Sequence, residues 1–88
     1  MITVQKLSEE EIAQRGIRDW PVWEKEASEF PWEYDSKEMC YILAGKICVT
    51  PEGGDPVSIE AGDYVEFAKG LKCTWTILED VRKHYQFE

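Results

Sequence analysis

Few side chains in this sequence can do chemistry. The chain has one histidine, His84, and three cysteines, Cys40, Cys48 and Cys73. A carboxylate such as that of Glu38 can carry a proton, and a cysteine thiolate can act as a nucleophile or a metal ligand. Three cysteines cannot all pair within one chain, no C-x-x-C spacing is present, and the single histidine excludes a zinc finger by ligand count.

Folding elements must bring such residues together, and only one stretch of the sequence indicates a helix. Ser8 followed three residues later by Glu11 is a capping box, and acidic residues fill the first turn after it. Gly16 stands where it can end the helix. We therefore predict a short helix over residues 7–15, which needs packing to be stable because it has only about two turns.

The rest of the chain has the pattern of short β-strands separated by glycine and proline turns. The strand candidates are residues 20–23 (an edge strand or a flap), 30–34, 39–43, 46–50, 57–59, 64–67, 73–77 and 81–87. Gly45 is expected to turn the chain between residues 39–43 and 46–50. Strands spaced in this way favour a small all-β sandwich or barrel.

The last two strand candidates alternate clearly. In residues 73–77 one face carries Cys73, Trp75 and Ile77. In residues 81–88 one face carries Val81, Lys83, Tyr85 and Phe87, and the other carries Arg82, His84, Gln86 and Glu88. The first of these stripes is typical of a barrel interior.

Two segments resemble the signature motifs of the cupin superfamily, H-x-H-x(3,4)-E-x6-G and G-x5-P-x-G-x2-H-x3-N. Glu38 and Gly45 match the end of the first motif, and Gly62 and Gly70 match the glycines of the second. The chain is similar to the small single-domain cupins grouped with ureidoglycine aminohydrolase and ethanolamine-utilisation proteins. The resemblance covers about residues 16–87 and implies an all-β double-stranded β-helix (jelly-roll) barrel, which is often a homodimer in the superfamily. Since 88 residues make only one domain, we predict a single cupin domain over residues 1–88, with the short N-terminal helix outside the barrel core.

The sequence departs from these motifs at the positions that bind metal in cupin metalloenzymes. Trp32 and Tyr34 stand at the two histidine positions of the first motif, and Cys73 stands at the histidine position of the second. Of the four expected ligands, only Glu38 is unchanged. An indole nitrogen offers no lone pair to a metal, and a tyrosine must ionise from a pKa near 10 to ligate.

The smallest set of metal ligands that the sequence could still supply is Glu38, Cys73 and His84. The strand alternation, however, places His84 on the face opposite Tyr85 and Phe87. We therefore predict a barrel without a metal and without another cofactor.

The resemblance implies that Trp32, Tyr34, Glu38 and Cys73 converge in the barrel, and Trp75 shares the interior stripe of Cys73. Such an aromatic cleft suits a small planar or cationic ligand, held by stacking, cation–π attraction and an ion pair with Glu38. Binding of a small metabolite is therefore our first hypothesis. The alternative for these residues is structural, with Glu38 hydrogen-bonded inside the barrel and Cys73 an inert thiol.

Two other functions stay open. The first is an enzyme acting on a small nitrogenous or carboxylated metabolite, with Glu38 as proton carrier assisted by Cys73 or Tyr34. Resemblance to ureidoglycine aminohydrolase suggests that substrate class, but the missing histidines argue against its metal-dependent reaction. The second is an interaction protein that self-associates through an aromatic strand face.

Composition excludes several kinds of partner. The chain of 88 residues has 10 Lys and Arg against 18 Asp and Glu, a net charge of −8. Acidic proteins repel nucleic-acid phosphates and anionic lipid, so we expect neither partner. No apolar run is long enough for a membrane span, and the first six residues lack the features of a secretion signal. With unpaired cysteines as well, we expect a cytoplasmic protein.

Overall fold

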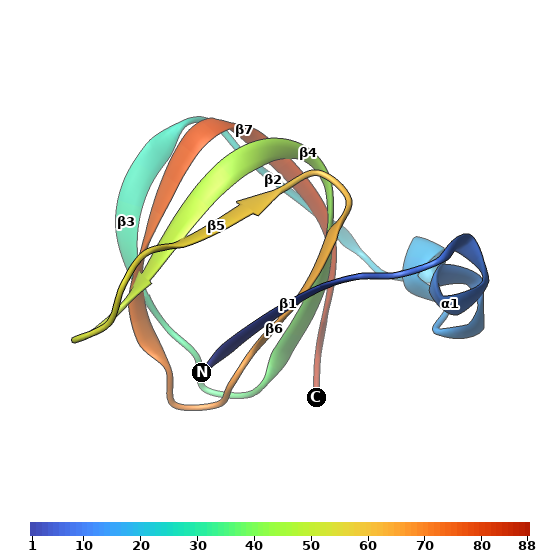
Figure 1. Cartoon of the computed structure of the whole chain (residues 1–88), viewed down its shortest axis with the longest axis horizontal. Coiled ribbons are helices and arrows are strands. Elements are labelled where there is room, and N and C mark those ends of the chain that lie inside the picture. Colours follow the sequence, from blue (N-terminus) through green and yellow to red (C-terminus); the bar gives the residue numbers. More distant parts are fainter.

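Two long, bent strands organise the structure, a computed structural model of residues 1–88 (Figure 1). The elements in chain order are β1 (Ile2–Lys6), α1 (Glu9–Gln14), the 3-10 helix η1 (Ile17–Asp19), β2 (Val22–Lys25), β3 (Ser28–Glu33), β4 (Glu38–Pro51), β5 (Val57–Glu60), β6 (Asp63–Phe67) and β7 (Lys72–Phe87). The sheet has the order β1-β6-β4-β7-β2, while β3 also pairs with β7 and β5 with β4. All of these pairings are antiparallel. The result is the predicted all-β jelly-roll barrel with a short N-terminal helix.

Each long strand changes partner halfway along its length. In β4, residues 38–41 pair with β6 and residues 46–49 pair with β5. In β7, residues 72–77 pair with β3 and residues 81–84 pair with β2. The two strands also pair with each other, with register shifts between Ile42 and Ile47. These irregularities let the sheet curl into a barrel, because bulges increase local bend and twist.

Gly45 lies at this bend, and the turn predicted there is wrong. The chain continues through Gly45 in one strand, β4, rather than reversing. Its φ is +105°, and an added Cβ would lie 2.6 Å from the Asp80 carbonyl oxygen and 2.8 Å from the Val81 Cα. Glycine is required because the bent backbones of β4 and β7 approach too closely for any side chain.

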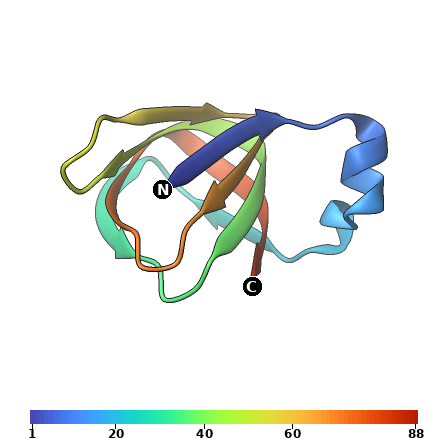
Figure 2. The ribbon, with the colours of Figure 1, turned by 60° about the horizontal axis from the view of Figure 1, so that its bottom comes forward.

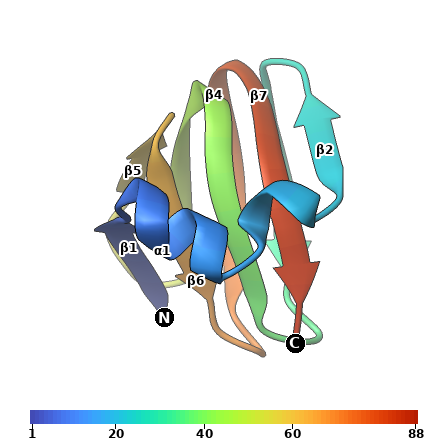
Figure 3. The same cartoon turned by 90° about the vertical axis from the view of Figure 1, so that its right-hand side faces the viewer.

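The predicted helix is confirmed, with α1 slightly shorter than expected. The Ser8 hydroxyl accepts a hydrogen bond from the Glu11 amide, and the Glu11 carboxylate accepts one from the Ser8 amide, both at 3.1 Å. α1 and η1 cross the outer face of the sheet (Figure 3), where Ile12 and Ile17 pack on Tyr64. This second small core supplies the packing that so short a helix needs. No helix in the structure has the length and apolar character needed to span a membrane.

The N-terminal strand β1 was not expected from the sequence. It pairs with β6 over residues 2–6, so the sheet begins well before the barrel core predicted from about residue 16. Four of its five residues are exposed, and only Ile2 packs against the main core. An edge strand with so little buried surface leaves a weak apolar pattern. In Figure 2, β1 crosses in front of the barrel, and α1 lies at the end opposite the β4–β5 loop.

The main core lies inside the barrel and consists of side chains from alternate strand positions. Twelve buried residues form it, including Cys73, Trp75, Ile77 and Val81 of β7. The interior stripe predicted for residues 73–77 is therefore confirmed, and it continues on Val81 and Lys83 after the bend. β2 ends the strand order, so the second half of the segment predicted at residues 20–23 lies in an edge strand, while Trp20 and Pro21 precede the strand.

Replacing Gly45 should test the close approach of β4 and β7. We expect Gly45→Ala to lower the free energy of unfolding by at least about 3 kcal/mol, because the methyl group meets backbone on β7 that cannot move independently. Urea denaturation followed by tryptophan fluorescence measures this loss.

Gly70→Ala is the matched control for backbone strain alone. Its φ is +85°, but nothing lies within 4 Å of an added Cβ. It should lose only about 1–2 kcal/mol. Equal losses for the two variants would contradict a steric role of Gly45.

Candidate functional site

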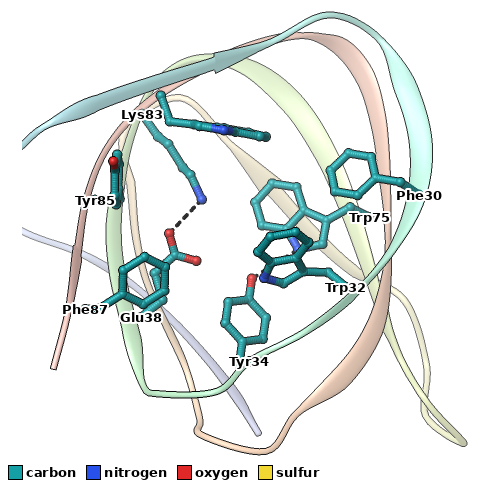
Figure 4. Close-up of a pocket in the computed structure, with 9 residues that line it drawn as sticks. Phe30, Trp32, Tyr34, Glu38, Trp75, Lys83, Tyr85 and Phe87 are labelled. Atoms are coloured by element: carbon teal, nitrogen blue, oxygen red, sulfur yellow. Dashed lines mark hydrogen bonds and ion pairs between the residues drawn. The ribbon is translucent and has the colours of Figure 1, made fainter.

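The barrel encloses a pocket of about 210 Å³ (Figure 4). Seven of its nine lining residues are aromatic, and the other two are Glu38 and Lys83. Trp32 and Phe87 are 49% and 47% exposed, so they form the accessible rim of the pocket. A pocket of this size lies below the range of about 300–1,000 Å³ that is usual for drug-sized ligands. It suits a smaller molecule.

The aromatic wall on one side comes from β3. Phe30 and Trp32 are two residues apart on β3, and Tyr34 follows directly after the strand, so all three side chains point to one face. Phe30 lies directly opposite Trp75 in the β3–β7 register. The two rings are stacked, with centroids 6.1 Å apart and an interplanar angle of 15°.

The opposite wall comes from β7 and β2. After the bend, β7 directs Lys83, Tyr85 and Phe87 toward the pocket. On the edge strand β2, Trp23 lies directly opposite Lys83. Trp23 also meets Trp75 edge to face at 6.1 Å. The pocket therefore depends on both halves of β7, which the bend brings to one interior.

A buried ion pair is the only charged feature of the pocket. Nζ of Lys83 donates a hydrogen bond to Oε2 of Glu38 at 2.8 Å, and the two side chains are only 6% and 4% exposed. The same ammonium lies 4.9 Å from the ring centroid of Trp23 and 4.6 Å from that of Trp75. Burying two charges is costly, and these close contacts with a carboxylate and two indole faces offset the cost.

A second polar contact joins two aromatic side chains. Nε1 of Trp75 donates a hydrogen bond to the Tyr34 hydroxyl oxygen at 3.1 Å. Tyr34 also stacks on Phe67, with centroids 4.9 Å apart and planes 7° apart. Burial, followed by the nearby Glu38 carboxylate, raises the pKa of Tyr34 well above its usual value. Tyr34 is therefore a neutral phenol that can donate its proton in a hydrogen bond.

Of the five residues predicted to bind a ligand, Trp32, Tyr34, Glu38 and Trp75 line the pocket, and Cys73 does not. Cys73 is buried opposite Trp32, and its Sγ donates a weak hydrogen bond to the Trp32 carbonyl oxygen at 3.7 Å. Burial, and then the Glu38 charge, raises the pKa of the Cys73 thiol. This environment is that of an inert thiol rather than of an activated nucleophile.

The residues at the cupin metal positions do not fit a metal ion. Glu38 is already paired with an ammonium group, and Tyr34 and Cys73 are held in their neutral forms. His84 points away from the pocket, as alternation predicted, and its Nδ1 lies 2.9 Å from the Trp20 carbonyl oxygen. No group of three His, Cys, Asp or Glu side chains comes close enough together to hold a metal. The minimum set of Glu38, Cys73 and His84 is therefore not assembled.

The role of Lys83 was not predicted from the sequence. A signal was present, because Lys83 lies on the same face of β7 as Val81, Tyr85 and Phe87. A lysine among residues of a buried apolar face calls for a partner charge. The partner, Glu38, is 45 residues away, so only the fold identifies it.

Comparisons with known proteins agree with this architecture. A model of the EutQ-like cupin domain matches residues 12–85. The solved structure of a DUF861 family protein from Thermotoga maritima is 49% identical, with a TM-score of 0.98 over 100% of both chains. None of the curated proteins compared with the chain matches it.

More distant solved structures share the fold. A putative ethanolamine utilization protein Q from Salmonella typhimurium is 23% identical, with a TM-score of 0.68 over 98% of this chain and 68% of that chain. An RmlC-like cupin from Shewanella frigidimarina is 12% identical, with a TM-score of 0.58 over 75% of this chain and 64% of that chain.

Removing one member of the ion pair should be more harmful than removing both. We expect Lys83→Met to lower the free energy of unfolding by about 3–5 kcal/mol, because Glu38 is left as an uncompensated buried charge. The double variant Lys83→Met/Glu38→Met should recover most of this loss. Urea denaturation of the three proteins measures the effect.

Lys46→Met is a matched control, since Lys46 pairs with Glu79 at 3.7 Å on the surface. That variant should change stability by less than about 1 kcal/mol. A Lys83→Met variant as stable as this control would contradict the structural importance of the buried pair.

The three cysteines should differ in reactivity. Burial raises the pKa of Cys40 to about 12 and raises that of Cys73, whereas Cys48 is only half-buried. A raised pKa means less thiolate at a given pH. At about pH 8, iodoacetamide should modify Cys48 at least about tenfold faster than Cys40 and Cys73, as judged by mass spectrometry of peptides.

The urea-unfolded chain is the control for this comparison, because its three thiols should react at similar rates. Rapid modification of Cys73 in the folded protein would contradict an inert thiol.

Proposed function

The chain belongs to the EutQ-like cupin domain family, and on that premise we propose that its barrel pocket binds a small metabolite without a metal. The observation that carries this proposal is the Lys83–Glu38 pair inside an aromatic pocket. A few polar groups within mostly apolar walls are typical of sites that orient a small ligand. The volume of about 210 Å³ limits the ligand to a small molecule.

The pairing and the protonation of the candidate catalytic groups favour binding over turnover. Glu38 is held at 2.8 Å by Lys83, and the pKa of Tyr34 lies well above its usual value. Cys73 has a raised pKa and lies outside the pocket lining. No nucleophile paired with a free base faces the pocket, and covalent catalysis by a side chain depends on such a pair.

The ion pair also narrows the kind of ligand. The sequence suggested a planar or a cationic molecule, the latter held by cation–π attraction and by Glu38. The Lys83 ammonium already makes those contacts with Glu38, Trp23 and Trp75. A cationic ligand has to compete with it, so the contacts favour a planar ligand that stacks on the aromatic walls.

The four tryptophans offer an internal test of this proposal. Trp23, Trp32 and Trp75 line the pocket, whereas Trp20 directly follows η1 and packs against the second core. Titration of ¹⁵N-labelled protein with phenol, a small planar probe, should shift the indole N–H signals of the three pocket tryptophans and leave that of Trp20 unchanged. Adding a chelator should not alter the binding curve.

Variants at the rim sharpen the test. Trp32→Ala should weaken phenol binding by roughly five- to tenfold, because a stacking surface is lost. Leu78→Ala is the matched control, since Leu78 is 58% exposed and lies outside the pocket. Shifts centred on Trp20, or binding that requires added metal, would contradict the proposal.

A further inference from the structure

The charges in the pocket are balanced before any ligand enters. The Lys83 ammonium contacts the Glu38 carboxylate and the faces of two indole rings, and the pair is almost fully buried. An anionic ligand has to share Lys83 with Glu38, and a cationic one has to share Glu38 with Lys83. A charge buried without its own partner is unfavourable, so the pocket selects against ligands with a net charge.

Two polar groups of the pocket lining, the Glu38 carboxylate and the Tyr34 hydroxyl, have hydrogen-bonding capacity left. Only Oε2 of Glu38 hydrogen-bonds to Lys83. Every fully buried polar side-chain atom has a hydrogen-bond partner, so the other oxygen, Oε1, which has none, is not fully buried, and Glu38 lines the cavity. Figure 4 shows the Glu38 carboxylate directed into the space between the aromatic walls and the Tyr34 hydroxyl at the edge of that space, pointing toward the indole of Trp75.

Glu38 and Tyr34 offer opposite hydrogen-bonding roles. Oε1 of Glu38 is an acceptor. The Tyr34 oxygen accepts from Nε1 of Trp75 at 3.1 Å, which leaves the phenol proton as a donor. The raised pKa of Tyr34 agrees with a phenol that keeps this proton.

From this geometry we propose that the pocket recognises a neutral, planar molecule with an N–H and a C=O side by side, as in a carboxamide or a lactam. The N–H donates to Oε1 of Glu38, and the C=O accepts from the Tyr34 hydroxyl. The flat face stacks on the aromatic wall that Phe30 and Trp75 form. This inference rests on the proposed function and names its ligand class.

Five probes that each contain one benzene ring separate the contributions of the N–H group, the C=O group and the net charge to binding. Benzamide has both groups, aniline has only N–H, and acetophenone has only C=O. Benzoate adds a negative charge and benzamidine a positive one. We expect benzamide to bind at least about tenfold more tightly than each of the other four, because each lacks one hydrogen bond or brings an unpaired charge. The indole N–H shifts of the pocket tryptophans give the affinities.

The variant Tyr34→Phe tests whether the Tyr34 hydroxyl is the donor to the C=O group of the ligand. This variant should weaken benzamide and acetophenone binding by about tenfold and leave aniline binding unchanged, because only the first two accept the phenol proton. Unchanged aniline binding also reports that the pocket is intact.

The outcomes separate the two proposals. Benzoate or benzamidine binding as tightly as benzamide overturns the choice of a neutral ligand. If all five probes bind with similar affinity and shift the pocket tryptophans, the proposed function stands but the amide preference is wrong. If none of the probes shifts a pocket tryptophan, both proposals fail.

Discussion

A buried ion pair between Lys83 and Glu38 is the constraint on which the site depends. Two charges at 2.8 Å in an aromatic interior are tolerated only because each neutralises the other and two indole faces surround the ammonium. The pair balances the two charges of the pocket, occupies the contacts that a cation would make, and uses only one of the two Glu38 oxygens. The ligand class that we propose therefore follows from an interaction within the protein itself.

This pair also explains how the chain departs from metal-binding cupins. The superfamily motif keeps one acidic residue, here Glu38, while rings and a buried thiol stand at the three histidine positions. In this barrel, Glu38 receives its positive partner from Lys83 on β7 rather than from a metal ion. An ammonium on a strand cannot act as a Lewis acid, so the proposed function relies on shape, stacking and hydrogen bonds.

The bend shared by β4 and β7 is what assembles the site. Trp75 precedes the bend of β7 and Lys83 follows it, yet both face the same cavity. Gly45 permits this because a side chain there would overlap the backbone at Asp80. The pocket therefore depends on a position that touches none of its walls, through the curvature that the position allows.

Local patterns in the sequence were sufficient for the helix cap at Ser8, for the interior stripe with Trp75, and for placing Trp32, Tyr34 and Glu38 through the cupin motifs. Those features depend on neighbours a few residues apart or on a motif of fixed spacing.

Three other features depended on the tertiary structure: the continuous bend at Gly45, the exclusion of Cys73 from the pocket, and the pairing of Lys83 with Glu38. Alternation tells which face of a strand a side chain occupies, but not which distant strand lies across from it. Contacts between residues 45 positions apart arise only when the barrel closes.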